Sequence, residues 1–505
     1  MNSFYITTPI YYVNDKPHIG HAYTTIACDI FARYHKLLNN NVYFLTGTDE
    51  HGQKVEKAAI KSSKNPQQFV DEMSKNFKDL IPFLNCEIDD FIRTTETRHK
   101  KAAQHLWNKL EDNNQIYLSN YEGWYSVRDE TFYLETELSK KGDKLITPSG
   151  DEVELVKEES YFFKLSEWKD KLIEYYVSNP NSILPKTRYN EVLSFIRGGL
   201  KDLSISRTTF KWGIPVPNDK HHVMYVWIDA LCNYLTSIGY PDEKSKSFKK
   251  FWPAMHIVGK DILRFHAVYW PAFLMAAGLQ PPKRVFAHGW WTNEGEKISK
   301  SVGNVIDPYD IVSSYGLDQI RFFLFREVPF GNDGDFSRDS IAQRVNSDLS
   351  NNFGNLVQRI CLFIKKNCNY KINNNFNLTD DDKKLLDFSV QKHKKYIIFM
   401  ENQEIDKALK EIFQLLTEAN VYVDKQAPWI LKRSDPARME TVLSISIELI
   451  KRSTLMLYPV IPESCLKIFS IINFEIKELN FNQYNILPKH PNIINEPQII
   501  FPRIE

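Results

Sequence analysis

The chain has 505 residues, of which 43% are apolar and 25% charged, the composition of a globular protein of roughly two to four domains. Lys and Arg total 64 against 63 for Asp and Glu, which excludes a global basic field for nucleic acid but not a local patch. No apolar run reaches the roughly 20 residues that cross a bilayer, and the N-terminal residues lack signal- or transit-peptide character. Six cysteines without a CxxC pair indicate a reducing cytoplasm.

Strands alternate with helices in the first part of the chain. β-Branched and aromatic residues predict a strand within residues 3–12, and apolar residues at helical spacing predict a helix over 20–38. Residues 41–47 form a second predicted strand. Short apolar strands that end in Gly and polar residues recur at 255–261 and 284–289. This alternation predicts an α/β fold with a Rossmann-like, doubly wound parallel sheet, whose ligands bind beyond the carboxyl ends of the strands.

The sequence changes character twice, which divides it into predicted domains. A Tyr- and Trp-rich stretch with turn signals predicts an α+β insertion at residues 116–221. The insertion separates the two halves of the sheet domain, 1–115 and 222–290. A loop region at 291–345 follows, and long helical periods predict an all-α helix bundle at 346–505.

The segment "HIGH" begins the first predicted helix with two histidines around a glycine. A helix N-terminus after a strand offers free backbone N–H groups and positive partial charge, which suit an anion. Gly20 lets a nucleotide approach the backbone, and His18 and His21 could donate hydrogen bonds to phosphate oxygens. Alternatively, they are simply polar residues at a helix start.

A second candidate lies about 280 residues later, in the Gly- and Ser-rich loop "NEGEKISKSVGN". Lys297 and Lys300 could hold a triphosphate there and stabilise departing pyrophosphate. An isolated pair of this kind is otherwise a solvated basic loop.

Taken together, HIGH and KISKS resemble the signatures of the class I aminoacyl-tRNA synthetases, HIGH and KMSKS. The resemblance implies that the core binds ATP with Mg²⁺, joins an amino acid to AMP and passes the acyl group to tRNA. No covalent enzyme nucleophile is needed, because the carboxylate of the amino acid attacks the α-phosphate. The implied catalytic residues are His18, His21, Lys297 and Lys300; the implied ATP-binding residues are His18, Gly20, His21, Gly259, Asp261, Lys297, Ser299 and Lys300.

Further motifs resemble the methionyl-tRNA synthetase family along nearly the whole chain, in order "TTPIYYVNDKPHIGHAYT", "FLTGTDEHGQKV", "YVWIDALCNYL", "IVGKDILRFHAVYWPA", "FAHGWWTNEGEKISKS" and "YVDKQAPW". In this family Asp49 would hold the α-ammonium of methionine, and an aromatic pocket would take the polarizable thioether. Leu231 stands where many members have proline, which leaves the pocket shape open. The implied methionine-binding residues are Ile10, Tyr12, Asp49, Trp227, Ala230, Tyr234, Ile262 and His266.

The same resemblance implies that the helical tail reads the CAU anticodon of tRNA(Met), initiator and elongator, through Asn355, Arg359 and Trp429. The spacing i, i+4 places Asn355 and Arg359 on one helix face, and Trp429 could stack on an unstacked base. Singly, Arg359 could be a surface charge and Trp429 a core residue of the bundle. Residues 116–221 would be the connective, acceptor-end domain, and 291–345 would contact the stem.

Two absences add expectations. Because no cysteine lies between Cys86 and Cys232, we expect no structural zinc or other metal site and assign the chain to the zinc-free branch. The chain stops at Glu505 without an additional C-terminal tRNA-binding module, so we expect a monomer. The lack of targeting and membrane-spanning segments predicts that it stays in the cytoplasm and does not bind membranes.

Three other functions are compatible with single motifs. Another class I synthetase, such as the leucine enzyme, is disfavoured because the insertion is too short for an editing domain. A tRNA-free adenylyltransferase would not need the helical tail, and an inactive RNA-binding paralogue would not need intact HIGH and KISKS motifs.

Overall fold

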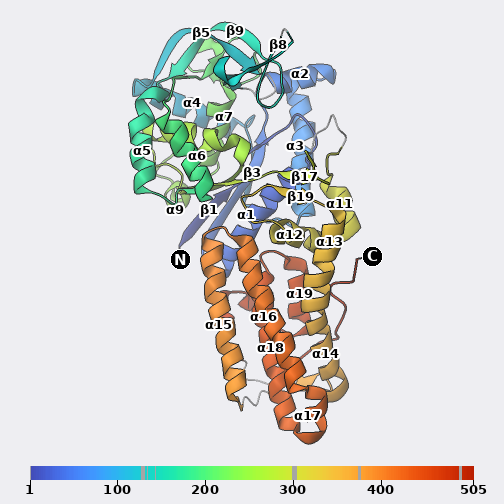
Figure 1. Cartoon of the computed structure of the whole chain (residues 1–505). Helices are drawn as coiled ribbons and strands as arrows, with labels where there is room; N and C mark the ends of the chain where they lie inside the picture. The colour runs from blue at the N-terminus through green and yellow to red at the C-terminus, as the bar shows by residue number, and fades with distance from the viewer. Residues whose placement is uncertain are drawn as a thin grey trace. The chain divides into compact units, whose positions relative to one another are not determined.

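The computed structural model describes residues 2–126, 131–133, 135–142, 144–297, 304–373, 377–487 and 492–504. The chain forms two compact units (Figure 1). The sheet unit comprises residues 3–17 and 43–287, and the helical unit comprises 1–2, 18–42 and 288–505. Within the described residues, no helix combines the length and apolar character needed to span a membrane.

A seven-stranded sheet forms the centre of the sheet unit, in the order β10-β16-β15-β1-β3-β2, with β4 also paired to β3. The pairs β1–β15, β2–β3, β3–β4 and β10–β16 are parallel, which confirms the predicted parallel sheet. Because β1 is parallel to β15, and β2 is parallel to β3, the carboxyl ends within each of these pairs lie at the same edge of the sheet. The bounds are β1 Ser3–Thr7, β2 Tyr11–Tyr12, β3 Asn41–Asp49, β4 Asp90–Arg93, β10 Ile183–Leu184, β15 Met255–Gly259 and β16 Arg284–His288.

Helices pack on this sheet through apolar side chains. Trp107 and Trp270, both fully buried, belong to a core that also contains Leu45 and Ile92 of the strands. Asn65 caps the N-terminus of one helix by accepting a hydrogen bond from the Gln68 N–H. The helices are α2 Gln53–Lys61, α3 Pro66–Phe83, α4 Thr97–Asp112, α7 Val226–Leu231, α8 Asn233–Thr236, α9 Lys246–Phe251 and α10 Trp270–Ala276.

The insertion contains the predicted mixture of strands and helices. Its long strands β5 (Ile116–Ser126) and β9 (Glu154–Phe163) are antiparallel. One strand of the predicted insertion, β10, pairs with β16 of the central sheet, so the insertion also contributes to that sheet. Its other elements are β6 Thr131–Tyr133, β7 Ser139–Lys141, β8 Lys144–Ile146, α5 Lys169–Ser178, α6 Lys186–Arg197, β11 Leu203–Ser204, β12 Ser206–Arg207, β13 Pro215–Val216 and β14 Asp219–Met224.

The helical unit contains α1 (Ile19–Leu37), a small sheet and the C-terminal helices. In the small sheet, β17 (Trp291–Asn293) pairs with β18 (Glu296–Lys297) and with β19 (Gly334–Phe336). The predicted bundle is present, and α15, α16 and α18 pack side by side (Figure 1). The helices are α11 Pro308–Tyr315, α12 Leu317–Arg326, α13 Arg338–Arg344, α14 Asn355–Cys368, α15 Asp380–Glu401, α16 Ile405–Gln426, α17 Pro428–Ser434, α18 Pro436–Leu457 and α19 Pro462–Ile471, with a π-helix at Val345–Gly354.

A buried ion network fixes α1 within the helical unit. The Asp29 carboxylate accepts hydrogen bonds from Arg33 Nε at 2.8 Å and from Arg321 of α12 at 2.6 Å. The Arg321 guanidinium also donates to the carbonyl of Val460 at 2.8 Å. Removing one partner of such a buried pair costs about 3–5 kcal/mol, because the other charge is left without compensation. The first helix is therefore anchored to elements some 300 residues away in the sequence.

Candidate functional site

The two histidines of HIGH cap the helix that they begin. His18 is the N-cap of α1, and its Nδ1 accepts the Gly20 N–H at 3.1 Å. His21 Nδ1 accepts the His18 N–H at 3.0 Å, which completes a reciprocal capping box. Because both Nδ1 atoms accept, a neutral ring carries its proton on Nε2. Each imidazole is thus prepared to donate from Nε2.

The expectation of free backbone N–H groups at this helix start is wrong. The Ile19 N–H donates to the Ile306 carbonyl at 3.1 Å, and the Gly20 N–H is bound by His18. The His21 N–H donates to the His18 carbonyl at 2.9 Å. A Cβ on Gly20 would lie 2.9 Å from His18 Cε1, so this glycine makes room for the imidazole ring. Donors for an anion here are therefore side chains rather than the backbone.

Both flanks of the KISKS segment are anchored at the same place in the helical unit. Lys297 ends β18, a short strand rather than the predicted loop, and the flank after the motif reaches Ile306, whose carbonyl accepts the Ile19 N–H. The Asn293 side chain donates to the Asn304 carbonyl at 2.9 Å and ties the two flanks together. The side chain of Lys297, and Ser299 and Lys300 entirely, lie outside the described residues.

The predicted methionine-binding residues all lie in the sheet unit, at or after strand ends. In the parallel pair β2–β3, Tyr12 is in register with Asp49, the last residue of β3. Trp227 of α7 stacks on Phe265 with ring centroids 3.6 Å apart, which brings α7 against the helical turns after β15. Ile10, Trp227 and Ile262 pack on the same core as buried Tyr234.

A hydrogen bond joins two of these residues and sets their protonation. His266 Nδ1 lies 3.0 Å from the Ile262 carbonyl, so Nδ1–H donates and Nε2 is left to accept. Tyr234 donates its hydroxyl to that Nε2 at 2.7 Å. Burial lowers the pKa of His266 to about 4, so the ring is neutral near pH 7. The pocket wall here is uncharged and rigidly oriented.

The two predicted adenosine-contacting residues lie at the end of β15 and just after it. Gly259 is its last residue, and Asp261 lies on the next turn with its side chain exposed. A Cβ on Gly259 would lie 2.5 Å from Asp261 Oδ1, so glycine permits the carboxylate to fold back over the strand end.

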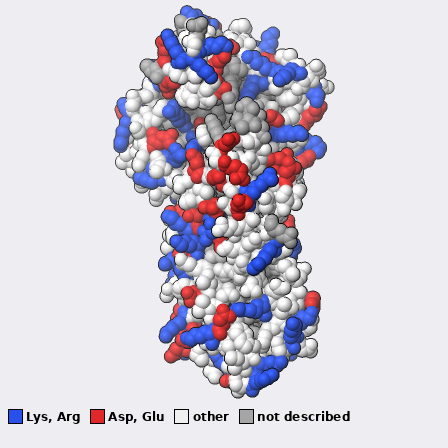
Figure 2. Space-filling model, turned by 45° about the vertical axis from the view of Figure 1, so that its right-hand side comes forward, with Lys and Arg blue, Asp and Glu red and all other residues white. Residues whose placement is uncertain are grey.

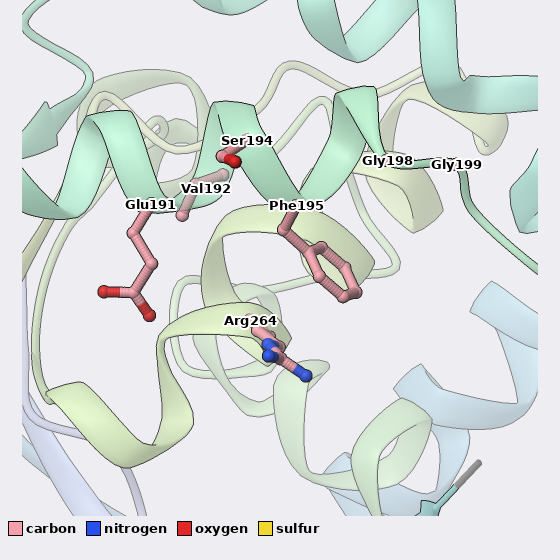
Figure 3. Close-up of a pocket in the computed structure, with 7 residues that line it drawn as sticks. All are labelled: Glu191, Val192, Ser194, Phe195, Gly198, Gly199 and Arg264. Carbon is pink, nitrogen blue, oxygen red and sulfur yellow. The ribbon is translucent and has the colours of Figure 1, made fainter. Parts of the chain in front are cut away.

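A pocket of about 360 Å³ opens beside this segment but is not the predicted site. It is lined by the end of α6 and by Arg264, whose guanidinium lies 4.4 Å from the Phe195 ring centroid (Figure 3). None of its lining residues was predicted. Arg264 lies between Ile262 and His266 in the sequence. Because residues two apart on a helix face different directions, Arg264 lines this pocket and its two predicted neighbours do not.

The predicted anticodon residues lie in α14 and α17 of the helical unit. Asn355 is exposed at the start of α14, and Arg359, one turn later, donates to Asp424 of α16 at 2.8 Å. Trp429 in α17 follows that Asp424 by five residues, and 46% of its surface is exposed. The interpretation of Trp429 as bundle core is therefore wrong, and its ring is available to a partner. Figure 2 shows Lys and Arg interspersed with Asp and Glu over the visible face, in agreement with the net charge of +1.

Comparisons with known proteins cover the whole chain. A family model described as tRNA synthetases class I (M) matches residues 4–361, and one described as the anticodon binding domain of methionyl tRNA ligase matches residues 373–505. The chain belongs to the class I methionyl-tRNA synthetases. This is a family of ATP-dependent aminoacyl-tRNA ligases.

Individual methionyl-tRNA synthetases agree with this assignment over their full length. The methionine–tRNA ligase of Rickettsia bellii is 52% identical over 514 residues, which cover 100% of this chain and 99% of that protein. That of Mesorhizobium japonicum is 49% identical, covering 99% and 97%. The structure of the Mycobacterium tuberculosis methionyl-tRNA synthetase in complex with methionyl-adenylate has a TM-score of 0.97 at 44% identity and covers 100% of both chains.

A buried group that the sequence did not predict lies among the elements that carry the predicted methionine-binding residues. Asp229 contacts His51 and His99, which lie 178 and 130 residues away from it. Asp229 stands inside the apolar segment "YVWIDALCNYL", and a charge there was a signal that a buried partner exists. Nothing in the sequence indicated which histidines they are. Among the described residues, no three His, Cys, Asp or Glu side chains gather as metal ligands.

Proposed function

We propose that this chain activates L-methionine with ATP, as its Mg²⁺ complex, to methionyl-adenylate and transfers the methionyl group to tRNA(Met). In the first step a carboxylate oxygen of methionine attacks the α-phosphate and pyrophosphate leaves. In the second, a hydroxyl of the tRNA terminus attacks the carbonyl carbon and AMP leaves. The observation that carries the proposal is the full-length match, at 44% identity, to a structure with methionyl-adenylate bound.

ATP is bound by the HIGH and KISKS segments. His18 and His21 donate from Nε2 to phosphate oxygens. The capping box supports this role, because in each neutral ring Nδ1 accepts a backbone N–H and the proton is on Nε2. Lys297, Ser299 and Lys300 stabilise the charge on departing pyrophosphate. Gly259 and Asp261 border the adenosine. The anchoring of Ile306 to Ile19 supports the pairing of the two motifs.

Methionine binds at the carboxyl ends of β1, β3 and β15. Asp49 pairs with the α-ammonium group, and the thioether lies among Ile10, Tyr12, Trp227, Ala230, Tyr234, Ile262 and His266. Sulfur packs favourably against aromatic rings, and a neutral His266 avoids placing a charge beside an apolar chain.

The tRNA is recognised by its CAU anticodon, in both initiator and elongator forms. Asn355 and Arg359 contact base edges, and Trp429 stacks on an unstacked base. The exposure of Trp429 supports this role. We further propose that the protein acts as a cytoplasmic monomer without structural zinc.

Pyrophosphate exchange tests the first step. Methionine should drive the exchange of labelled pyrophosphate into ATP without tRNA, and leucine should not. Exchange with leucine, or in the absence of any amino acid, would contradict the proposed substrate. Charging of tRNA(Met), with a CAU→CAC anticodon variant as the control, tests the second step.

A further inference from the structure

The carboxylate of Asp229 lies fully buried between two imidazole rings. Its Oδ2 is 2.6 Å from His51 Nδ1, and its Oδ1 is 2.7 Å from His99 Nε2. Burial by itself raises the pKa of this carboxyl, but His51 and His99 outweigh that effect and lower the pKa to about 2. The carboxylate is thus ionised near neutral pH, and each oxygen accepts one ring N–H. A buried charge persists only with such partners.

The three residues belong to three different elements. His51 is the second residue after β3, Asp229 lies in α7, and His99 lies in the first turn of α4. The second ring nitrogen of His99 is 3.3 Å from the hydroxyl of Thr236 in α8. The Asp229 carboxylate therefore joins the end of a sheet strand to a short helix and to a long helix of the sheet unit.

Both sides of this connection carry residues of the proposed methionine pocket. His51 is two residues after Asp49, and its carbonyl accepts the Tyr12 hydroxyl at 2.9 Å. On the other side, α7 supplies Trp227 and Ala230, which flank Asp229 in the sequence.

The strand end is held firmly, whereas α7 depends on its tertiary contacts. The Trp212 indole donates to the Glu50 carbonyl at 2.6 Å, and the Gly52 N–H donates to the Trp212 carbonyl at 3.0 Å. By contrast, α7 has six residues and no side-chain cap at its N-terminus. A helix of this length is not stable alone, so its position is set by the bonds that it makes to its neighbours.

We propose that Asp229 is a positioning residue for methionine: through His51 and His99 it holds the helix that bears Trp227 and Ala230 against the strand end that bears Asp49. The inference rests on the proposed function of this pocket. Asp229 itself does not touch the substrate. It keeps the aromatic wall at the correct distance from the carboxylate that binds the ammonium group.

The test is the Michaelis constant for methionine in pyrophosphate exchange, measured beside that for ATP. Because a misplacement of about 1 Å can cost about 100-fold, we expect Asp229→Asn and His99→Leu to raise KM for methionine at least about 10-fold. The KM for ATP should change less than about 2-fold, since α7 carries no residue assigned to ATP.

The matched control is His99→Gln. The Gln side-chain N–H takes the place of His Nε2–H and can still donate to Asp229, so KM for methionine should stay within about 3-fold of the wild-type value. If Asp229→Asn fails to fold, the His99→Leu and His99→Gln pair decides alone. A His99→Leu protein with a lowered Tm and an unchanged KM for methionine would overturn the inference, because the network would then serve stability only.

Failure of the inference can be separated from failure of the proposed pocket. Trp227→Ala should raise KM for methionine in any case, since Trp227 belongs to the pocket itself. If Trp227→Ala has this effect and both Asp229→Asn and His99→Leu do not, the positioning role is wrong and the pocket stands. If Trp227→Ala also has no effect, the pocket assignment is wrong.

Discussion

The Nδ1 atoms of His18 and His21 each accept a backbone N–H, so each ring presents Nε2–H. Each histidine side chain therefore has two tasks: its Nδ1 caps the start of α1, and its Nε2–H is the proposed phosphate donor. A variant can separate the tasks if it keeps the acceptor at Nδ1 and removes the donor at Nε2.

His21→Asn is such a variant. In α15 the side chain of Asp382, equally short, reaches back to the Thr379 N–H at 2.9 Å, so Asn at the same helix position can accept the His18 N–H. We expect Tm to change little and methionyl-adenylate formation to fall about 10²–10³-fold, as after loss of one transition-state donor. Single-turnover kinetics and thermal unfolding measure the two effects. A normal rate in a stable His21→Asn protein would show that Nε2 has no catalytic role.

Gly20 is expected to act through His18. Its replacement by Ala places Cβ 2.9 Å from His18 Cε1 and displaces the ring, so we expect adenylate formation to fall at least about 10-fold. Stability should change little, because the preference for Ala over Gly in helices, about 0.5–1 kcal/mol, is offset by weakening of the cap that His18 gives to the Gly20 N–H. In a His18→Ala background, Gly20→Ala should have no further effect on the rate. Additive losses would mean that Gly20 contacts the nucleotide directly.

At the scale of elements, α17 presents a side chain that the core of the bundle does not use. Trp429 is 46% exposed and its neighbour Ile430 is 62% exposed, although both stand within a bundle of amphipathic helices. The proline at the start of α17 and the left-handed Ala427 before it turn the chain sharply after α16, which places this short helix at the end of the bundle (Figure 1).

Trp429→Ala should therefore impair charging of tRNA(Met) and spare pyrophosphate exchange. Base–aromatic stacking contributes about 1–3 kcal/mol, so kcat/KM for tRNA should fall about 5- to 150-fold. Ile430→Ala, at the adjacent and more exposed position, is the control and should charge tRNA normally. Equal loss of both reactions in Trp429→Ala, with a lowered Tm, would instead assign the ring to bundle stability.

At the scale of the whole molecule, buried neutral histidines make stability depend on pH. Burial lowers the pKa of His266 to about 4 and that of His256 well below 6.5. Between pH 6.5 and about 4 the unfolded chain binds a proton at His266 that the folded chain does not, so stability falls as the pH falls through this range, and His256 acts in the same direction. A histidine that is protonated in the unfolded chain and neutral in the folded chain contributes about 1.4 kcal/mol per pH unit.

We accordingly expect unfolding of the sheet unit by urea to require clearly less denaturant at pH 5 than at pH 7.5. His256→Gln should reduce this difference, because it removes one of the two groups. His221→Gln, at an exposed histidine, should leave the difference unchanged. A His256→Gln protein with the full pH dependence would show that His256 does not contribute.

Several parts of the fold and site could be predicted from local pattern. Short runs of β-branched, aromatic and other apolar residues identified the strands β1, β3, β15 and β16, which are buried on both faces. Apolar residues at helical spacing identified the helices α1, α16 and α18, because burial on one face imposes that period. The family and its activity followed from short motifs, because phosphate and methionine binding restrict the residue types at a few positions. The roles of the individual site residues stay predictions.

The parallel sheet, the helical bundle and the methionyl-tRNA synthetase family could thus be inferred from the sequence, because each is indicated by short segments whose pattern or motif is complete within itself. Tertiary structure alone decided which nitrogen of each HIGH histidine is occupied, that Ile306 closes against Ile19, and that Asp229 lies between His51 and His99. These contacts join residues far apart in the sequence or depend on ring orientation. Such contacts form only when the packed elements bring donor and acceptor together, so the local spacing of apolar residues does not predict them.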